Sequence, residues 1–264
     1  MKILVIGDVT GNAGCGCLRE LLPGVKKQYG VDMVVANGEN SSPTNGISPR
    51  SAGFLFDSGV NVITTGNHVF RRKEIFEYLD SGSLIIRPAN YAKENPGKGW
   101  CAYDMGRIQV CVVNLIGSLY LENNRSPFDA ADEVLNEIAR SVGTKNILVD
   151  FHAEATSEKR AMGFYLDGRV SAVFGTHTHV PTADACLLPK GTAYITDLGM
   201  TGPVHSVIGM PPEVAVKKFR TGISENFRFA DGLSKMDTVL LDLDEKSGNI
   251  SQIMQLTFTQ SDKS

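Results

Sequence analysis

Several features that would assign this sequence to a disulfide-bonded, zinc-finger or membrane protein are missing from it. Its five cysteines are an odd number and form no C-x-x-C pair, so the sequence offers neither a disulfide framework nor a zinc finger. No segment contains the roughly 18 consecutive apolar residues of a membrane-spanning helix. The apolar run at residues 3–6 is too short for a signal peptide. We therefore expect a soluble, cytoplasmic protein with reduced thiols and no membrane partner.

An excess of charge of one sign is also missing. The 26 lysines and arginines nearly balance the 29 aspartates and glutamates, which gives a formal net charge of −3. A protein that coats nucleic acid non-specifically needs a strongly basic face, which this composition does not provide, although it is compatible with a local basic groove. Repeats, low-complexity segments and linker-like stretches are absent as well. We expect one domain over residues 1–264, although the length alone would allow two.

Short, β-branched apolar runs recur along the chain and predict buried strands. Several are continuous rather than alternating, which is typical of a sheet that is covered on both faces. The predicted strands are residues 2–7, 32–37, 60–65, 84–86, 109–114, 146–151, 170–175 and 194–196. Helical patterns lie between many of them, at residues 18–29, 48–56, 131–142 and 212–219. Alternating strands and helices indicate an α/β fold that is built in layers.

The C-terminal part of the chain has a different pattern. Two strand-like runs at residues 236–244 and 250–258 are joined by a turn-rich segment at residues 245–249, and this spacing predicts a β-hairpin. Residues 100–105 and 107–113, which Gly106 separates, predict a second hairpin. We therefore expect mixed sheets with antiparallel strands at an edge, the C-terminal strands among them.

Polar side chains gather where the predicted strands end. They are Asp8, Glu39, Asn40, Asn67, His68, His152, His177 and His179. Ligands of α/β proteins bind beyond the carboxyl ends of the strands, so we expect these side chains to share one site. Each alone could be a turn residue or a buried core residue. Their joint placement, with four of only five histidines in the chain, favours a shared function.

The chemistry of this set favours metal ions. Carboxylates, amide oxygens and imidazoles suit iron, manganese, zinc or cobalt. In an extended chain the rings of His177 and His179 point the same way, so both can reach one cluster. The set is too large for a single closed tetrahedral site, whereas two ions that share a bridging carboxylate would use it. A pair of ions roughly 3.5–4 Å apart is a common device for phosphoryl transfer.

A glycine-rich segment after the first predicted strand suggests a rival interpretation. Gly11, Gly14 and Gly16, with Glu39 near the end of the second strand, superficially match a dinucleotide-binding fold. Their spacing is Gly-x-x-Gly-x-Gly rather than G-x-G-x-x-G, and Asp8 would bring negative charge towards a pyrophosphate. An NAD-dependent dehydrogenase is therefore the weaker hypothesis. We expect the glycines to let backbone amides approach a bound phosphate where the following helix begins.

The order of the strand-end motifs resembles the calcineurin-like metallophosphoesterases, and most closely the YmdB-type phosphodiesterases. The motifs that carry the resemblance are Gly7-Asp8, Gly38-Glu39-Asn40, Gly66-Asn67-His68, His152 and Gly175-Thr176-His177-Thr178-His179. Further stretches that look like this family lie at residues 87–90, 96–99, 150–159 and 190–197. The resemblance runs from about residue 3 to the final strands, and such long motifs are specific.

The resemblance implies a four-layer α/β/β/α sandwich with a site for two metal ions, usually iron or manganese. It implies that one ion is bound by Asp8, Glu39, Asn40 and His179, and that Glu39 bridges to a second ion, which Asn67, His152 and His177 complete. His68 is the implied acid. The implied activity is hydrolysis of phosphodiesters, including 2′,3′-cyclic nucleotides, through attack by a metal-bridging hydroxide. The substrate would be a small molecule or derived from RNA.

The sequence departs from the family pattern at two places. Thr10 stands where metallophosphoesterases in general have a histidine, a difference that YmdB-type proteins share, and Asn40 would fill the vacancy. Phe70-Arg71 stands where a Trp-Asp pair is expected in this family. This second change alters the rim beside His68, so the sequence does not identify the substrate-binding residues.

Other functions stay open at this point. The chain could be a metal-stabilised regulatory or binding module with weak catalysis, although the ligands and the acid are all present. Within the enzyme class, the substrate could instead be an RNA end or a phosphomonoester. An assembly of identical chains is also compatible with the sequence.

Overall fold

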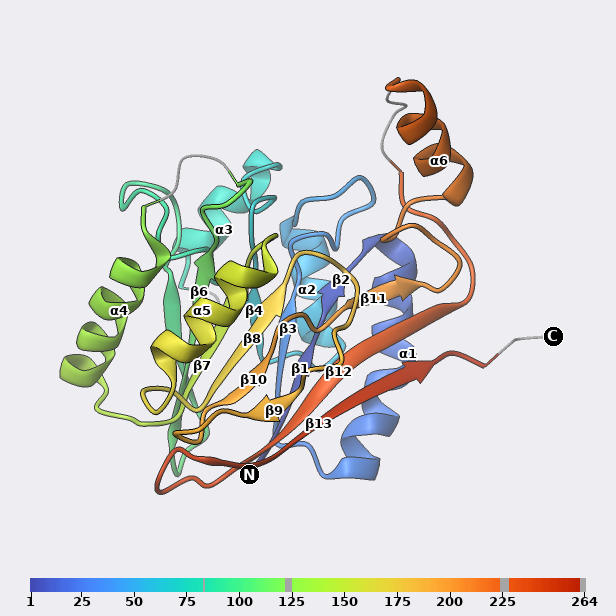
Figure 1. The fold of residues 1–264 in the computed structure, drawn as a ribbon. Coiled ribbons are helices and arrows are strands. Elements are labelled where there is room, and N and C mark those ends of the chain that lie inside the picture. The colour runs from blue at the N-terminus through green and yellow to red at the C-terminus, as the bar shows by residue number, and fades with distance from the viewer. Residues whose placement is uncertain (83, 122–124, 224–227, 262–264) are drawn as a thin grey trace.

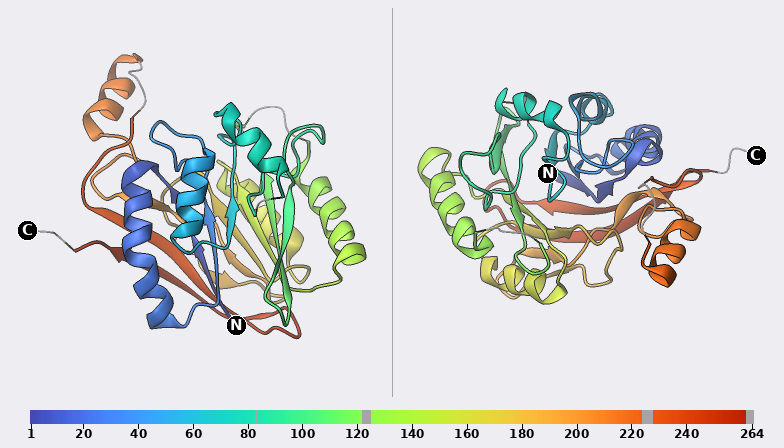
Figure 2. Two further views of the ribbon diagram at one scale, coloured as in Figure 1. Left: turned by 180° about the vertical axis from the view of Figure 1, so that it is seen from behind. Right: turned by 90° about the horizontal axis from the view of Figure 1, so that it is seen from above.

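Two β-sheets stacked face to face form the centre of the protein, and helices cover the outer face of each sheet (Figures 1 and 2). The computed structural model describes residues 1–82, 84–121, 125–223 and 228–261. The predicted four-layer α/β/β/α sandwich with mixed sheets is therefore confirmed. The prediction of one domain over the whole chain stays a prediction.

The first sheet has seven strands in the order β2-β11-β12-β1-β3-β4, with β13 paired to β12. The strands are β1 (Lys2–Ile6), β2 (Asp8–Val9), β3 (Met33–Asn37), β4 (Val62–Thr64), β11 (Met200–Pro203), β12 (Ser234–Leu243) and β13 (Ile250–Thr259). β1, β3 and β4 run parallel. The hairpin of β12 and β13 is antiparallel, as predicted. In the parallel part Ile6 pairs with Ala36 and Asn37 with Thr64, so these strands end at nearly the same level.

The second sheet has six strands in the order β5-β6-β7-β8-β10-β9. They are β5 (Trp100–Asp104), β6 (Gln109–Ile116), β7 (Ile147–His152), β8 (Ala172–Thr176), β9 (Cys186–Leu187) and β10 (Ala193–Ile195). The four central strands are parallel, and an antiparallel strand lies at each edge. His152 pairs with Thr176 at the carboxyl ends of β7 and β8. Both sheets therefore present the ends of parallel strands to a common side of the molecule.

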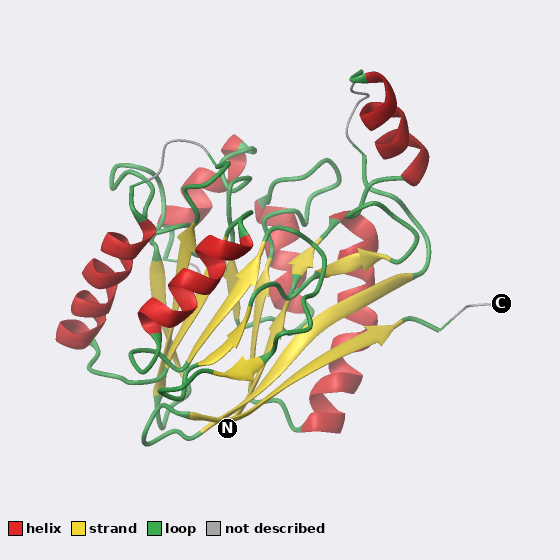
Figure 3. Ribbon diagram, in the orientation of Figure 1, coloured by secondary structure: helices red, strands yellow, loops and turns green. Residues whose placement is uncertain are grey.

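The helices belong to different layers. The helical elements are α1 (Gly11–Tyr29), α2 (Pro49–Asp57), a 3₁₀ turn η1 (Lys73–Ile75), α3 (Phe76–Asp80), α4 (Pro127–Ser141), α5 (Thr156–Leu166) and α6 (Pro212–Thr221). α1 and α2 pack on the first sheet, and α4 and α5 pack on the second. Figure 3 shows α6 projecting away from both sheets. None of the helices in the described part of the chain has the length and hydropathy of a membrane-spanning segment.

Three apolar cores hold the four layers together. One lies between the first sheet and its helices, one between the two sheets, and one between the second sheet and its helices. β1 illustrates the arrangement, because Leu4 and Ile6 belong to the first core and Ile3 and Val5 to the core between the sheets. A strand that is buried on both faces needs a continuous apolar run, which is the pattern that the sequence has there.

The structure differs from the predicted elements in a few places. Residues 84–86 form only an isolated bridge, from Ile85 to Ile63, rather than a strand. The strands β2, β9 and β11 were not predicted, since each has only two to four residues and short segments carry little periodicity. Helix α1 begins at Gly11, well before the predicted start at residue 18. The predicted cap of α2 is confirmed, because the Ser48 hydroxyl accepts a hydrogen bond from the Ser51 amide.

The glycines at the start of α1 do not form the predicted phosphate cradle. The Gly11 amide donates to the Asn40 carbonyl, at 2.8 Å, and the Gly14 amide donates to the Thr10 carbonyl, at 2.9 Å. Gly14 is required by a close approach, because a Cβ there would lie 2.2 Å from the carbonyl oxygen of Thr201 on β11. These two glycines therefore serve the packing of α1 against its neighbours rather than a ligand.

Candidate metal centre

The predicted site residues come together at the side of the molecule where the parallel strands end. Asp8 follows β1, Glu39 and Asn40 follow β3, and Asn67 and His68 follow β4, so these five come from the first sheet. The second sheet supplies the three others. His152 is the last residue of β7, and His177 and His179 follow β8. The site therefore lies where the carboxyl edges of the two sheets meet.

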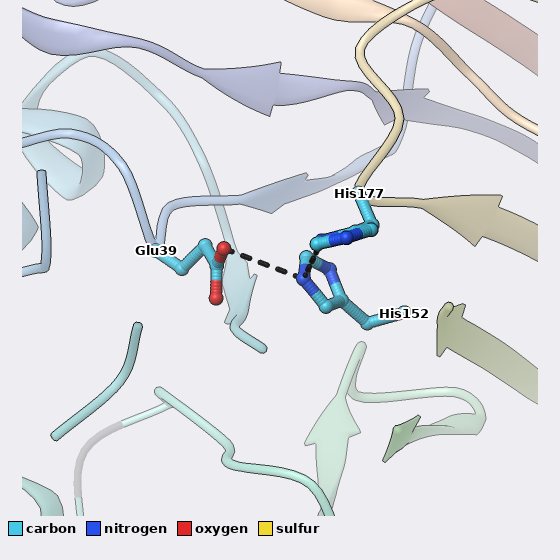
Figure 4. Close-up of side chains that lie close together, drawn as sticks. All are labelled: Glu39, His152 and His177. Atoms are coloured by element: carbon cyan, nitrogen blue, oxygen red, sulfur yellow. Dashed lines mark hydrogen bonds and ion pairs between the residues drawn. The ribbon is translucent and has the colours of Figure 1, made fainter. Parts of the chain in front are cut away.

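Three of these residues surround a nitrogen atom of a fourth. The Nε2 atom of His152 lies 3.3 Å from Glu39 Oε1, 3.0 Å from Asn67 Oδ1 and 3.1 Å from His177 Nδ1. Figure 4 shows Glu39 and His177 both directed at the His152 ring. A single imidazole N–H can serve only one of these neighbours, so lone pairs outnumber protons. The ligand atoms of Glu39, His152 and His177 all lie within 4.8 Å of one another, which is an arrangement that a cation would satisfy.

Asp8, Asn40 and His179 form a second group that adjoins the first through Glu39. Asn40 Nδ2 lies 3.4 Å from both Glu39 Oε1 and His179 Nε2. Asp8 is fully buried, and its Oδ1 atom has no hydrogen-bond partner in the described part of the chain. The nearest cationic atom, His179 Nε2, is 3.6 Å away, which is an ion-pair distance but too long for a hydrogen bond. A buried carboxylate oxygen without a partner is costly, so this group also fits a cation.

The carboxylates and His177 have charge states that suit metal binding, whereas two other histidines would have to release a proton to bind an ion. Burial opposes ionisation of Glu39, but the charges and hydrogen bonds of His152 and His68 outweigh it and hold the pKa of Glu39 well below its usual range. Burial likewise opposes ionisation of Asp8, and attraction to His179 keeps the pKa of Asp8 lowered. Burial and the neighbouring His152 lower the pKa of His177 to about 3. Burial lowers the pKa of His179, but Asp8 outweighs it and raises this pKa to about 9, and Glu39 likewise outweighs burial and raises the pKa of His152. Ionised carboxylates and a neutral imidazole are the forms that bind metal ions.

The loop that carries His177 and His179 differs from the predicted extended conformation. Both residues have positive φ angles, 102° and 64°, which is uncommon for residues other than glycine. Several hydrogen bonds hold this backbone. The His177 amide donates to Asp8 Oδ2 at 3.2 Å, and His179 Nδ1 lies 2.9 Å from the Ile208 carbonyl oxygen. The two rings reach the cluster through this left-handed backbone and not through strand alternation.

Sequence reasoning did not identify a buried ion pair behind this loop. Lys159 Nζ lies 2.6 Å from Asp197 Oδ2, and both side chains are almost fully buried. Lys159 also donates to the Thr176 carbonyl at 2.8 Å, and the Thr178 amide donates to Asp197 at 3.2 Å. The pair therefore forms hydrogen bonds with the backbone on each side of His177. The sequence does contain a sign of this pair, because Lys159 and Asp197 are the last residues of two stretches that resemble the family, 150–159 and 190–197.

We expect Lys159→Met to destabilise the protein by about 3–5 kcal/mol, because Asp197 would be left buried without its partner. Denaturant unfolding measures the effect. Lys93→Met is the matched control, since Lys93 is 79% exposed in its ion pair with Glu133, and it should cause a much smaller loss. Adding Asp197→Asn to Lys159→Met should recover part of the stability. A Lys159→Met protein as stable as the wild type would contradict this assignment.

A second set of buried groups orients His152. Thr176 Oγ1 lies 2.9 Å from His152 Nδ1 and donates to Asp150 Oδ1 at 2.7 Å. The other carboxylate oxygen of Asp150 accepts from Thr64 and Asn37. Burial raises the pKa of Asp150 to about 7. Partners of this kind fix the ring orientation of a metal-binding histidine, so the Nε2 atom of His152 is held towards the cluster.

His68 occupies a different position from the other histidines. Its Nδ1 atom lies 2.8 Å from Asn40 Oδ1 and 3.2 Å from Glu39 Oε1, and its amide donates to Glu39 Oε2 at 2.9 Å. Its ring lines a cavity of about 230 Å³, and its side chain is 21% exposed. With Nδ1 turned towards Asn40 and Glu39, the other ring nitrogen is left for a molecule in the cavity.

The cavity of about 230 Å³ lies directly over the cluster. Its polar wall consists of Glu39, Asn40, His68, Glu154, His177, Thr178 and His179, and its apolar wall of Ile208, Met210 and Phe229. A larger cavity of about 1310 Å³, between α4 and residues 93–99, contains none of the predicted site residues. The chemistry of the site therefore points to the smaller one. Sequence reasoning did not identify the apolar wall, since residues 208, 210 and 229 lie outside the strand-end motifs.

Comparison with known proteins gives a consistent result. The family model described as "YmdB-like protein" matches residues 4–256. A Bacillus subtilis protein named 2′,3′-cyclic-nucleotide 2′-phosphodiesterase is 43% identical over 256 residues, which cover 97% of this chain and 96% of the relative.

Solved structures agree with the family match. A crystal structure of a hypothetical protein from Thermus thermophilus superposes with a TM-score of 0.92 at 39% identity, covering 99% of this chain and 100% of that one. A crystal structure described as that of a novel phosphatase from Mycoplasma pneumoniae also has a TM-score of 0.92, at 34% identity, with 100% and 95% covered.

Proposed function

Because the chain belongs to the YmdB-like protein family, we propose that it is a metal-dependent phosphodiesterase that hydrolyses small nucleotide phosphodiesters, 2′,3′-cyclic nucleotides among them. The family resemblance carried by the strand-end motifs is confirmed, and with it the assignment to the phosphoesterases. The observation that carries the proposal is the convergence of lone pairs on His152 Nε2, beside a buried Asp8 oxygen that has no hydrogen-bond partner among the described residues.

The two groups of side chains would hold two metal ions, and we propose iron or manganese. Asp8, Asn40 and His179 would bind one ion, and Asn67, His152 and His177 the other. Glu39 would serve both ions, because its carboxylate adjoins both groups: Oε1 lies 3.3 Å from His152 Nε2 and accepts a hydrogen bond of 3.4 Å from Asn40 Nδ2. When bound, such ions supply Lewis-acid chemistry, polarising phosphoryl oxygens and making water a nucleophile at neutral pH.

Side chains of the protein itself would orient the reacting groups and donate a proton to the leaving group. Asn40 Oδ1 and Glu39 Oε1 hold the His68 ring through Nδ1 and are both acceptors, so Nδ1 carries a hydrogen. Nε2 of the doubly protonated ring would then donate a proton to the leaving oxygen of the ester, which leaves the ring neutral. A proton donor positioned in this way typically contributes about 10²–10⁴-fold to a rate. His152 is fixed by its buried partners Thr176 and Asp150, and Asn67 contacts its Nε2 atom, so these two side chains would keep one orientation during the reaction.

Metal analysis combined with a substrate panel tests this proposal. We expect about two metal ions per chain, and hydrolysis of 2′,3′-cyclic nucleotides ahead of 3′,5′-cyclic nucleotides and phosphomonoesters. A metal-free protein that binds NAD would instead support a dehydrogenase. Metal-loaded protein that hydrolyses none of the panel would support the regulatory or binding module.

A further inference from the structure

A tight turn beside the metal centre contains an unusual residue. The amide and carbonyl groups of Val207 and Met210 exchange hydrogen bonds of 2.8 and 2.9 Å, so the turn has two central residues, Ile208 and Gly209. Their φ angles are 48° and 97°, both positive, as a type I′ turn requires. Such turns favour Asn-Gly, Asp-Gly or Gly-Gly, and a β-branched residue at positive φ is an outlier. Something other than the turn itself must account for isoleucine at this position.

The backbone contact of Ile208 does not explain its side chain. The Ile208 carbonyl oxygen lies 2.9 Å from His179 Nδ1 and so helps to orient that ring, but any residue offers a carbonyl group. The side chain is 49% exposed and lines the cavity over the cluster, next to Met210 and Phe229. Isoleucine is disfavoured at this φ angle, and its exposed side chain gains little from packing. We therefore infer that the side chain serves to contact a molecule in the cavity.

The ring of Phe229 packs closely against the backbone at two glycines, Gly11 and Gly209. A Cβ at Gly11 would lie 2.6 Å from the ring of Phe229, and one at Gly209 would lie 3.3 Å from it. Ala230 also donates its amide hydrogen to the Gly209 carbonyl at 2.7 Å. The ring thus rests against the backbone of α1 and of the turn, and it forms a wall of the cavity that exists before any ligand binds.

We propose that Ile208, Met210 and Phe229 form a subsite for the nucleobase of a nucleoside phosphate. This inference rests on the proposed function and names the part of the substrate that the apolar wall recognises. Glu39 and His177 line the same cavity, and the proposed function would place the phosphoryl group beside them. A flat aromatic base attached through ribose would cover the apolar wall and stack on the ring of Phe229, whereas inorganic phosphate would leave this wall exposed to water. The volume of about 230 Å³ falls below the roughly 300–1,000 Å³ of drug-sized sites, so the cavity can take at most one nucleotide unit.

A pair of substrates tests the subsite. The metal-loaded protein is assayed with a 2′,3′-cyclic nucleotide and with ribose 2′,3′-cyclic phosphate, which lacks the base. We expect Phe229→Ala to lower the ratio of the two kcat/KM values, nucleotide over base-free ester, by about tenfold, mainly through KM. Phe229→Trp should preserve the ratio. Phe219→Ala is the matched control, because Phe219 on α6 is 82% exposed, and it should leave the ratio unchanged.

The outcomes separate the two proposals. A wild-type protein that hydrolyses neither ester overturns the proposed function. A wild-type protein that hydrolyses both, with the same ratio in Phe229→Ala, overturns the subsite and leaves the function standing.

A stability measurement gives a readout that does not depend on activity. Ile208→Asn places a residue that favours the turn at this position and retains the carbonyl group that contacts His179. We expect the Tm of the metal-free protein to rise by about 2–4 °C, while the preference for the nucleotide over the base-free ester falls. A lower Tm would show that Ile208 is needed for packing, and an unchanged preference would show that it does not contact the base. Either result would overturn its assignment to the subsite.

Discussion

Replacing His68 with alanine should lower the hydrolysis of a 2′,3′-cyclic nucleotide by about 10²–10⁴-fold while the protein keeps its metal ions. The ring lines the cavity, and Asn40 and Glu39 hold it through Nδ1, so its loss removes a proton donor. The effect should be much smaller for a diester with a nitrophenolate leaving group, because that group departs without a proton. Turnover and elemental analysis on the same samples measure both parts of the prediction.

The fifth histidine provides a matched control. His205 is exposed and lies outside the cluster, so His205→Ala should change neither turnover nor metal content. Loss of metal from His68→Ala would instead make His68 a ligand. An equal loss of activity for both leaving groups would exclude a role in proton donation.

The second large effect is expected at Glu39. Glu39→Gln keeps the size of the side chain and removes the charge that faces His152, His68 and Asn40. Because the same carboxylate belongs to both groups of ligands, we expect the protein to lose metal from both positions. Residues that only orient ligands typically cost about 10–100-fold in metal affinity or activity, and the loss at Glu39 should exceed this range. Metal titration and turnover measure the change.

Glu154 provides a graded comparison. Its Oε2 atom lies 3.0 Å from His177 Nε2, and its side chain is 50% exposed at the rim. Glu154→Gln makes the same chemical change at a residue that contacts a ligand from outside, and its effect should stay within about 100-fold. If the two variants were equally impaired, Glu39 would not be the bridging residue.

Much of the fold could be predicted because burial leaves a local signal. β1 lies between two cores, and its continuous apolar run indicates that both of its faces are buried. The hairpin of β12 and β13 has a turn-rich segment between two apolar runs. The prediction of a strand at residues 84–86 is wrong, because the short apolar run around Ile85 has the composition of a strand but forms only an isolated bridge. Pairing of such segments depends on a neighbour that is distant in sequence, which no local pattern reveals.

The candidate site was predictable for a related reason. Strands that end at the same level bring the residues after them together, so Asp8, Glu39 and His152 could be grouped without knowledge of their contacts. The positive φ angles of His177 and His179 could not be predicted, since they depend on hydrogen bonds to Asp8 and Ile208. The apolar wall was missed for the same reason, because Phe229 reaches the cavity by packing on Gly11.

The placement of the ligands on both sheets has a mechanical consequence. Ions shared by Asp8 from the first sheet and His179 from the second would act as a cross-link between the two halves of the sandwich. They would close a loop through most of the chain, as a disulfide does in other proteins. Binding of this kind stabilises the folded state by mass action, by about 2.7 kcal/mol at a hundredfold excess over Kd. Chelation would therefore weaken the contact between the sheets as well as stop the reaction.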